Sequence, residues 1–313
     1  MNRESKKGLV SVIMPVFNRE HYVSDALDSI LAQTYTNIEI IVVNDGSTDG
    51  SLDVLEGYRN RFSDKFVLIN QKNQGQVVAR NNGIAACSGE FIAFLDSDDL
   101  WLPEKLEKQI PLFDDNIGLV YSAVYNVTDS GEIIDITYCN ERVRGNAYDQ
   151  MLTGNKMTGG TVVLSRAAVL EVGLFDQSLS AAENWDLWIR VSKSFLLNYI
   201  NEPLVKYRKH DGNMSKDHKL MLSAIEQILN KHCAKEKPIA AIESSCNEAW
   251  ANYEYRKGLH YFSKQEYVTA RVCFSNALQL HSNYKDARAR LFRTYLGKRC
   301  NAFLAAMKSM VST

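Results

Sequence analysis

Acidic side chains follow two apolar runs of this 313-residue sequence, each at the point where the run ends. Asp45 stands close behind Ile38–Val43, which reads IEIIVV, and the segment Asp96–Asp99, which reads DSDD, follows Phe91–Leu95. Three carboxylates in so short a segment repel one another, and a divalent cation among them lowers the repulsion. Ligation by oxygen atoms favours Mg²⁺ or Mn²⁺ over zinc. The DSDD run therefore predicts a metal site that could neutralise a diphosphate leaving group.

Two further polar segments offer groups that could bind a nucleotide. Pro15–Arg19, which reads PVFNR, stands where another apolar run must turn, and Asn73–Gly75 precedes a helical pattern that carries Arg80. A carboxylate such as Asp45 accepts hydrogen bonds from a base or a ribose hydroxyl, and a guanidinium pairs with phosphate or stacks on a base. The sequence thus predicts one site for a nucleotide, a diphosphate and a metal ion.

Alternating strands and helices must position these segments. The expected strands are Leu9–Met14, Ile38–Val43, Phe66–Asn70, Phe91–Leu95, Leu119–Tyr125 and Thr161–Leu164. The expected helices are Tyr22–Gln33, Gln76–Ala86 and Trp185–Ser192. A further helix, capped by Ser47 or Thr48, is expected to run to about Tyr58. Such alternation with short turns is typical of a mostly parallel sheet covered by helices on both faces. Ligands bind beyond the carboxyl ends of the strands in such sheets. We therefore expect the turns after Met14, Val43 and Leu95 at one edge.

Each of these segments also has a plainer interpretation. The sequence NDGS after Val43 is a common turn, and DSDD before Leu100 could be a helix N-terminus with favourable negative charge. Arg80 taken alone is a solvated helix residue. Only the order and spacing of all the segments together favour the nucleotide site.

The long motifs VSVIMPVFNRE, EIIVVNDGSTDGS, NQGQVVARNNGIAACSGEFIAFLDSDDLW and ENWDLWIR resemble those of family 2 glycosyltransferases. The resemblance covers roughly Val10–Ser215 and implies the GT-A fold, a nucleotide-diphospho-sugar donor, and inversion at the anomeric carbon. It further implies a hexosyl- or related transferase of polysaccharide biosynthesis that uses a UDP-sugar and a glycan, lipid-linked or other cell-surface acceptor. A nucleotidyltransferase is the weaker alternative, because PVFNRE is not a glycine-rich basic loop.

The resemblance also implies roles for single residues. Donor contacts are implied for Pro15, Phe17, Asn18, Arg19, Asp45, Arg80, Asp96 and Ser97. Asp98 takes the metal position of a DxD-like motif, and Asp99 is an alternative ligand for Mn²⁺ or Mg²⁺. His210, in YRKHDGNMS, matches a histidine that could ligate the metal or contact the diphosphate, although a lone histidine is more often structural.

One residue departs from the family pattern. Many members read EDWDLW where this chain reads ENWDLW, so the aspartate that acts as general base falls on Asn184. An amide cannot take a proton from an acceptor hydroxyl, and inverting transfer needs a base at the reacting oxygen. Either Glu183 or Asp186 takes this role, or catalysis is impaired. In the last case the chain would be a nucleotide-sugar-binding scaffold protein.

Strand patterns stop near Lys216, and helical periodicity continues from there to the end of the sequence. Within this part, Glu254–Ala287 resembles a tetratricopeptide repeat, whose small and aromatic positions fall on Gly258, Tyr261, Tyr267, Ala270, Phe274 and Ala277. A plain helical hairpin is the alternative, and Ala234–Pro238 is the expected linker between helices. The sequence predicts a GT-A catalytic domain at 1–215 and an all-α domain at 216–313 that binds a protein partner or a second copy.

Composition excludes several other classes of protein. The formal net charge of -1 provides no global attraction to nucleic acid. No run approaches the roughly 18 apolar residues of a membrane span, and no signal peptide is recognised, so we expect a cytoplasmic protein. Peripheral contact with the inner face of a membrane stays compatible with the sequence. The six cysteines are scattered without a CxxC pair, which predicts reduced thiols and no disulfide.

Overall fold

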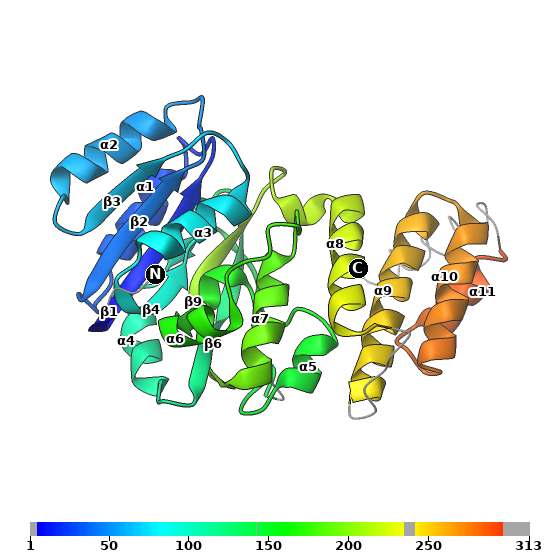
Figure 1. Ribbon diagram of the computed structural model, residues 1–313. Helices are drawn as coiled ribbons and strands as arrows, with labels where there is room; N and C mark the ends of the chain where they lie inside the picture. The colour runs from blue at the N-terminus through cyan, green and yellow to red at the C-terminus, as the bar shows by residue number, and fades with distance from the viewer. Residues whose placement is uncertain (1–4, 142, 235–241, 297–313) are drawn as a thin grey trace. The chain divides into compact units, whose positions relative to one another are not determined.

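The computed structural model describes residues 5–141, 143–234 and 242–296 (Figure 1). The chain forms two compact units, the first consisting of Met1–Met151 with Asn155–Lys216 and the second of Leu152–Gly154 with Asp217–Thr313. The first unit contains all the strands of the described chain, and the second is helical. Each unit has a core of its own.

The first unit is an α/β structure built on one sheet (Figure 1). Its strands are β1 (Lys6–Val16), β2 (Ile38–Asn44), β3 (Phe66–Asn70), β4 (Gly89–Phe94), β5 (Leu100–Trp101), β6 (Ile117–Thr128), β7 (Ile133–Thr137), β8 (Val163–Ser165) and β9 (Leu196–Lys209). Over the described residues their order is β3-β2-β1-β4-β8-β6-β9-β5, and β7 pairs with β6. The pairs among β3, β2, β1 and β4 are parallel, whereas β8 is antiparallel to both β4 and β6. The parallel arrangement predicted for the first four strands is confirmed, and the rest of the sheet is mixed.

Helices cover both faces of this sheet. The helices that precede β9 in the chain are α1 (Val23–Leu31), α2 (Ser51–Arg61), α3 (Gln76–Ala86), α4 (Lys105–Gln109), α5 (Tyr148–Leu152), α6 (Arg166–Val172) and α7 (Glu183–Ser194). Val12 and Met14 of β1 share a core with Leu27 of α1, while Ile13 lies so close to Gly83 of α3 that a side chain at Gly83 would clash with it. Because successive side chains of a strand point to opposite faces, α1 and α3 lie on opposite sides of β1.

The central strand β1 continues past the end that the sequence predicts. Pro15 pairs with Val43 of β2 and lies inside the strand. The ladder to β4 reaches its end at Ile13, whose carbonyl accepts from the amide of Leu95 at 3.1 Å. Proline lacks an N–H, but at Pro15 this group would face the side where β4 has already ended. The strand therefore tolerates Pro15 and carries the chain directly to the edge of the sheet.

The turns after β1 and β2 are tied to each other, which corrects the predicted helix cap. Helix α2 begins at Ser51 after Gly50, and its start has no side-chain cap. Ser47 Oγ instead accepts from the Asn18 amide at 3.1 Å, and the Thr48 amide donates to Asn18 Oδ1 at 2.8 Å. The cap prediction was wrong because the hydroxyls of Ser47 and Thr48 both bond to Asn18 in the turn after β1. The consequence is a fixed spacing between the two turns.

The second unit contains helices α8 (His218–His232), α9 (Glu243–Ser263), α10 (Tyr267–Leu280) and α11 (Ala287–Arg293). Helices α9 and α10 form a hairpin, in which a Cβ atom at Gly258 would lie 2.7 Å from the Phe274 ring. Ala270, Phe274 and Ala277 are fully buried. The predicted helical region is confirmed, while its assignment to the tetratricopeptide class stays a prediction. Neither these helices nor the others described are long and apolar enough to cross a membrane.

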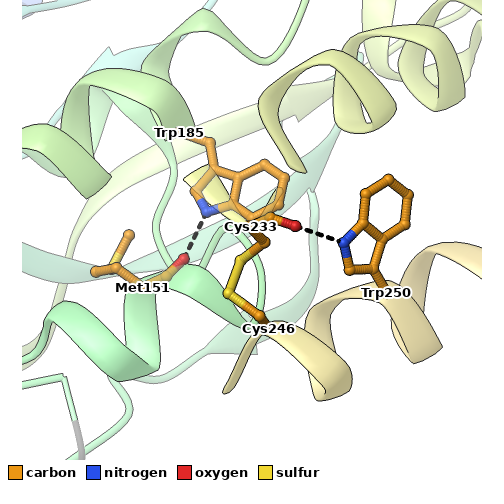
Figure 2. The surroundings of a disulfide bond; sticks show 5 residues. All are labelled: Met151, Trp185, Cys233, Cys246 and Trp250. Carbon is orange, nitrogen blue, oxygen red and sulfur yellow. Dashed lines mark hydrogen bonds between the residues drawn. A yellow bond between two sulfur atoms is a disulfide. The ribbon is translucent and has the colours of Figure 1, made fainter. Parts of the chain in front are cut away.

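A disulfide joins Cys233, just after α8, to Cys246 in α9 (Figure 2). The prediction that the cysteines are unpaired was therefore wrong. The two residues are 13 apart in sequence, and their Cα atoms lie 5.3 Å apart. Trp250 Nε1 donates to the Cys233 carbonyl at 3.0 Å, which is a second link between the end of α8 and α9. Apart from Ala234, the predicted linker Ala234–Pro238 lies outside the described residues.

Candidate active site

Asp45 follows β2 and organises the loop in front of α3. Its Oδ1 accepts from Gln71 Nε2 at 2.8 Å and from the Gln74 amide at 2.8 Å, and its Oδ2 accepts from the Gly75 amide at 2.9 Å. The side chain is buried. A carboxylate has about four lone-pair positions, so the protein already uses most of those of Asp45. This residue consequently holds the Gln71–Gly75 loop against the end of β2.

The turn after β1 presents both apolar and cationic groups. Asn18 has a φ of 52°, a left-handed conformation that asparagine adopts more readily than most residues. Phe17 just before it is 43% exposed, and Arg19 follows with its amide donating to Ser51 Oγ at 2.8 Å. Of the predicted donor contacts in this turn, Pro15 is buried within β1. Phe17, Asn18 and Arg19 are the ones that solvent reaches.

Asp98 contacts polar side chains from two other segments of the chain. Its Oδ2 is 3.2 Å from Arg19 Nε and 3.1 Å from His210 Nε2. The His210 ring stacks on Tyr22 with centroids 5.4 Å apart, and its Nδ1 accepts from the Gly212 amide at 3.1 Å. Because Nδ1 accepts a hydrogen bond, a neutral His210 carries its proton on Nε2 and donates to Asp98. The structure thus brings together Asp98 and His210, which the sequence singles out separately.

Arg208 anchors the acidic run to β9, and the sequence analysis missed it. Its amide donates to Asp99 Oδ1 at 2.9 Å, and its Nε donates to the Asp98 carbonyl at 3.0 Å. Its Nη1 donates to the Asp129 carbonyl at 2.6 Å, and the guanidinium lies over the Tyr22 ring at 5.2 Å. In the sequence, only the position of Arg208 in YRKH, two residues before His210, indicates a role in the site. A single side chain therefore fixes the backbone on which Asp98 stands.

Asp99 is enclosed by protein, unlike Asp98. It has no exposed surface, and its Oδ2 has no hydrogen-bond partner among the described residues. Burial, followed by the charges of Asp98 and Asp96, raises the pKa of Asp99 well above its ordinary value. Ser97 beside it is also buried. This environment suits a neutral acid better than an exposed metal ligand.

Arg80 connects the acidic run to the start of α7. Its Nη2 donates to Asp96 Oδ1 at 2.5 Å, and its Nη1 donates to Glu183 Oε1. Gln76 Nε2 donates to the same Glu183 oxygen at 3.0 Å. Burial opposes the charge of Arg80, but the two carboxylates outweigh it and raise the pKa of Arg80 above its ordinary value. The solvated alternative for Arg80 is excluded, because its side chain is only 2% exposed.

The remaining two candidates on α7 have different surroundings. Asn184 lies beside Gly159, where an added Cβ would be 2.9 Å from its Nδ2, and its buried Oδ1 has no partner in the described part of the chain. Asp186 is fully buried and accepts from Arg190 Nε at 2.9 Å. Arg190 also donates to three carbonyls in Val172–Leu174. Asp186 therefore pairs with an arginine that ties α7 to the end of α6.

A metal ion would find few protein ligands here. No group of three or more His, Cys, Asp or Glu side chains within the described ranges could hold one. Asp98 offers a carboxylate in contact with solvent, whereas His210 could ligate through Nε2 only after moving its proton to Nδ1, which now accepts from Gly212. A cation here would have Asp98 as its protein ligand and would need further oxygen atoms from outside the protein to complete its coordination.

The sequence matches the family model described as glycosyl transferase family 2 over residues 11–170. It is 34% identical over 213 residues to the UDP-Glc:alpha-D-GlcNAc-diphosphoundecaprenol beta-1,3-glucosyltransferase WfgD of Escherichia coli, covering 66% of this chain and 79% of WfgD. The chain belongs to glycosyltransferase family 2, and the enzyme class predicted from the sequence is confirmed. Uncharacterized glycosyltransferases of Rickettsia species are also similar, and the alignments cover 67% of the first, 64% of the second and 35% of the next two.

Solved structures show the same fold. TarS 1-349 of S. aureus in complex with UDP-GlcNAc superposes with a TM-score of 0.66 at 19% identity, over 91% of this chain and 89% of TarS. The mannosyltransferase PcManGT from Pyrobaculum calidifontis in complex with GDP-Man and Mn²⁺ gives 0.63 at 17% identity, over 91% and 84%. The GT-A architecture expected from the sequence motifs is confirmed.

Proposed function

We propose that this chain is an inverting glycosyltransferase that moves a sugar from a UDP-sugar to a glycan or lipid-linked acceptor. The observation that carries the proposal is the convergence of Asp45, the Asp98–His210 pair and the Arg80-linked carboxylates of Asp96 and Glu183 around the turns that follow β2 and β4. The donors in the names of WfgD and the TarS complex, UDP-Glc and UDP-GlcNAc, support UDP. The diphosphoundecaprenol in the name of WfgD supports a lipid-linked acceptor.

The proposal assigns the reaction to residues 1–215 and leaves 216–313 as a helical domain for partner binding or self-association. A lipid-linked acceptor would bring the enzyme to the inner face of the cytoplasmic membrane by peripheral contact. The nucleotide would lie along the Gln71–Gly75 loop, which Asp45 holds, and along the exposed part of the turn after β1. Asp96 and Ser97 would lie next along the donor, nearer its diphosphate, and Asp96 is partly exposed.

A divalent cation, Mn²⁺ or Mg²⁺, would neutralise the diphosphate as it leaves when bound beside Asp98. The Mn²⁺ in the PcManGT complex supports this part of the proposal. His210 would keep the Asp98 carboxylate oriented through its Nε2–H, and Arg19 would be near enough to pair with a phosphate oxygen. Asp99, being buried, would support the turn from inside.

Glu183 is the carboxylate best placed to act as general base. Gln76 and Arg80 both donate to Oε1, which leaves Oε2 to take the proton of the acceptor hydroxyl. As that proton leaves, the hydroxyl oxygen bonds to the anomeric carbon, and the bond from this carbon to the diphosphate oxygen breaks with its electron pair. Asn184 is an amide and takes up no proton, and Asp186 has no exposed surface from which to reach an acceptor hydroxyl.

Asn184 itself favours a second candidate function. If no carboxylate accepts the proton, the chain binds a nucleotide sugar without transferring it and acts as a scaffold through its helical part. The burial of Glu183, which is only 2% exposed, also favours this non-catalytic function. The two functions differ in turnover and not in binding.

Two single substitutions separate these candidates. UDP release would be measured from a panel of UDP-sugars with Mn²⁺, for wild type, Glu183→Gln, Asn184→Asp and the control Glu202→Gln, which carries the same change on the surface. If Glu183 is the base, Glu183→Gln lowers kcat by about 10²–10⁴-fold and keeps UDP affinity. If wild type is slow and Asn184→Asp gains activity, the protein is impaired at this step. If neither variant differs from wild type, Glu183 is not the base.

A further inference from the structure

Arg80 has an environment that its expected role as a nucleotide contact does not explain. It lies in the first half of α3, and both of its terminal nitrogens donate to carboxylates of segments far away in sequence, Asp96 and Glu183. The Phe175 ring lies 5.8 Å from the guanidinium carbon. A guanidinium donates its protons in fixed, coplanar directions. The side chain of Arg80 therefore sets the separation and orientation of the two carboxylates.

The charges explain why an arginine is needed at this position. Glu183 is almost fully buried, and a buried carboxylate without a partner is strongly unfavourable. Arg80 supplies the opposite charge, and Gln76 adds a neutral hydrogen bond to the same oxygen. Without Arg80, Glu183 would lose its charged partner, and its carboxylate would no longer be held in one orientation for an acceptor hydroxyl.

We infer that Arg80 is a positioning residue, which holds Glu183 in place for proton removal and connects it to Asp96, and that it does not bind the nucleotide. This inference rests on the proposed function, in which Glu183 is the general base and Asp96 lies on the donor side. Gln76 is a second, weaker member of the same support. Deprotonation of the acceptor by Glu183 would then depend on Arg80 of α3, the helix that follows the Gln71–Gly75 loop.

The test compares Arg80→Lys with Glu183→Gln and with the double variant. Lysine keeps the positive charge but cannot donate to both carboxylates in one plane. UDP affinity, measured by calorimetry with Mn²⁺, is expected to stay within about threefold of wild type, while kcat falls by roughly 100-fold at unchanged donor KM. The double variant is expected to be no slower than Glu183→Gln alone, because both changes act on one step.

Arg190→Lys is the matched control, since Arg190 also pairs with a buried carboxylate of α7, that of Asp186, in the same unit. A fall in melting temperature shared by both lysine variants reports the structural cost alone. If Arg80→Lys does not fold, Gln76→Ala replaces it, with an expected kcat loss of about tenfold that disappears in the Glu183→Gln background.

A tenfold or larger loss of UDP affinity in Arg80→Lys would overturn the inference, because it would make Arg80 a nucleotide contact. Equal kcat in Arg80→Lys and wild type, or multiplied losses in the double variant, would overturn it as well. A wild type that transfers no sugar refutes the proposed function by itself. The UDP measurement then still decides whether Arg80 touches the nucleotide.

Discussion

The substitution Asp45→Asn isolates the role of a single carboxylate in shaping the nucleotide side of the site. Asp45 Oδ1 accepts two hydrogen bonds and Oδ2 accepts one, all from the Gln71–Gly75 loop. An asparagine can place its oxygen at only one of these positions. With the oxygen at the Oδ1 position, its amide group would face the Gly75 N–H, so two donors would meet in a buried place.

The magnitude follows from these contacts. Hydrogen bonds to a charged group contribute about 1.5–3 kcal/mol each, and neutral ones about 0.5–1.5 kcal/mol. Asp45→Asn loses one charge-assisted bond and weakens two, and the loss is partly offset because no charge is then buried. A destabilisation of about 3 kcal/mol results, or about 6–12 °C in Tm for a unit of roughly 200 residues.

Urea and thermal unfolding, followed by tryptophan fluorescence, measure this loss, and calorimetry with UDP and Mn²⁺ measures the accompanying loss of affinity. The matched control is Asp49→Asn in the same turn, where the carboxylate accepts from two backbone amides but remains partly exposed. Water and the asparagine oxygen can replace those bonds, so its cost should stay below about 1 kcal/mol. The reasoning is refuted if both variants unfold at the same urea concentration.

Three other substitutions test separate features. Asp98→Ala should abolish the Mn²⁺ dependence of UDP binding while the melting temperature is retained, and identical affinities with and without Mn²⁺ in both proteins would exclude a metal at this residue. Phe274→Ala should destabilise the α9–α10 hairpin by about 3–5 kcal/mol, read from far-UV circular dichroism, because its ring fills the space above Gly258; a change under about 1 kcal/mol would contradict this packing. Cys233→Ser should lower the stability of the second unit by about 3 kcal/mol under oxidising conditions, and a wild type whose unfolding does not respond to reductant would show that the disulfide does not form.

The bounds of helices and strands could be predicted where the apolar pattern and a glycine or proline indicate the same end. Phe66–Asn70 and Gln76–Ala86 have the predicted bounds, because a short apolar run and a helix that starts after Gly75 leave little choice. The strand through Pro15 could not be predicted, since proline is harmless there only because the neighbouring strand stops. Likewise, the disulfide between Cys233 and Cys246 depends on how α8 packs against α9, which residue spacing does not reveal.

The types of residues in the site could be predicted, but their partners could not. Arg80 stands out in ARNNG as a cation near an expected ligand, and a phosphate is then the natural partner. The structure gives it Glu183, 103 residues later, and the burial that makes this pair necessary is a property of the folded chain. Asp99 is a similar case, because its Oδ1 accepts from the amide of Arg208 in β9, 109 residues later.

The distance in sequence between Arg80 and Glu183 also has a consequence for how the protein folds. The parallel strands β3, β2, β1 and β4 are complete once residue 94 has been synthesised, so this half of the sheet can begin to pair on the ribosome. Arg80 must then wait until α7 emerges before its second carboxylate is available, and His210 follows later still. Contacts between such distant residues form late in folding and slow it. A nascent chain would thus complete the turn around Asp45 first, whereas the Arg80–Glu183 pair and then the Asp98–His210 pair could form only after α7 and β9 have been synthesised.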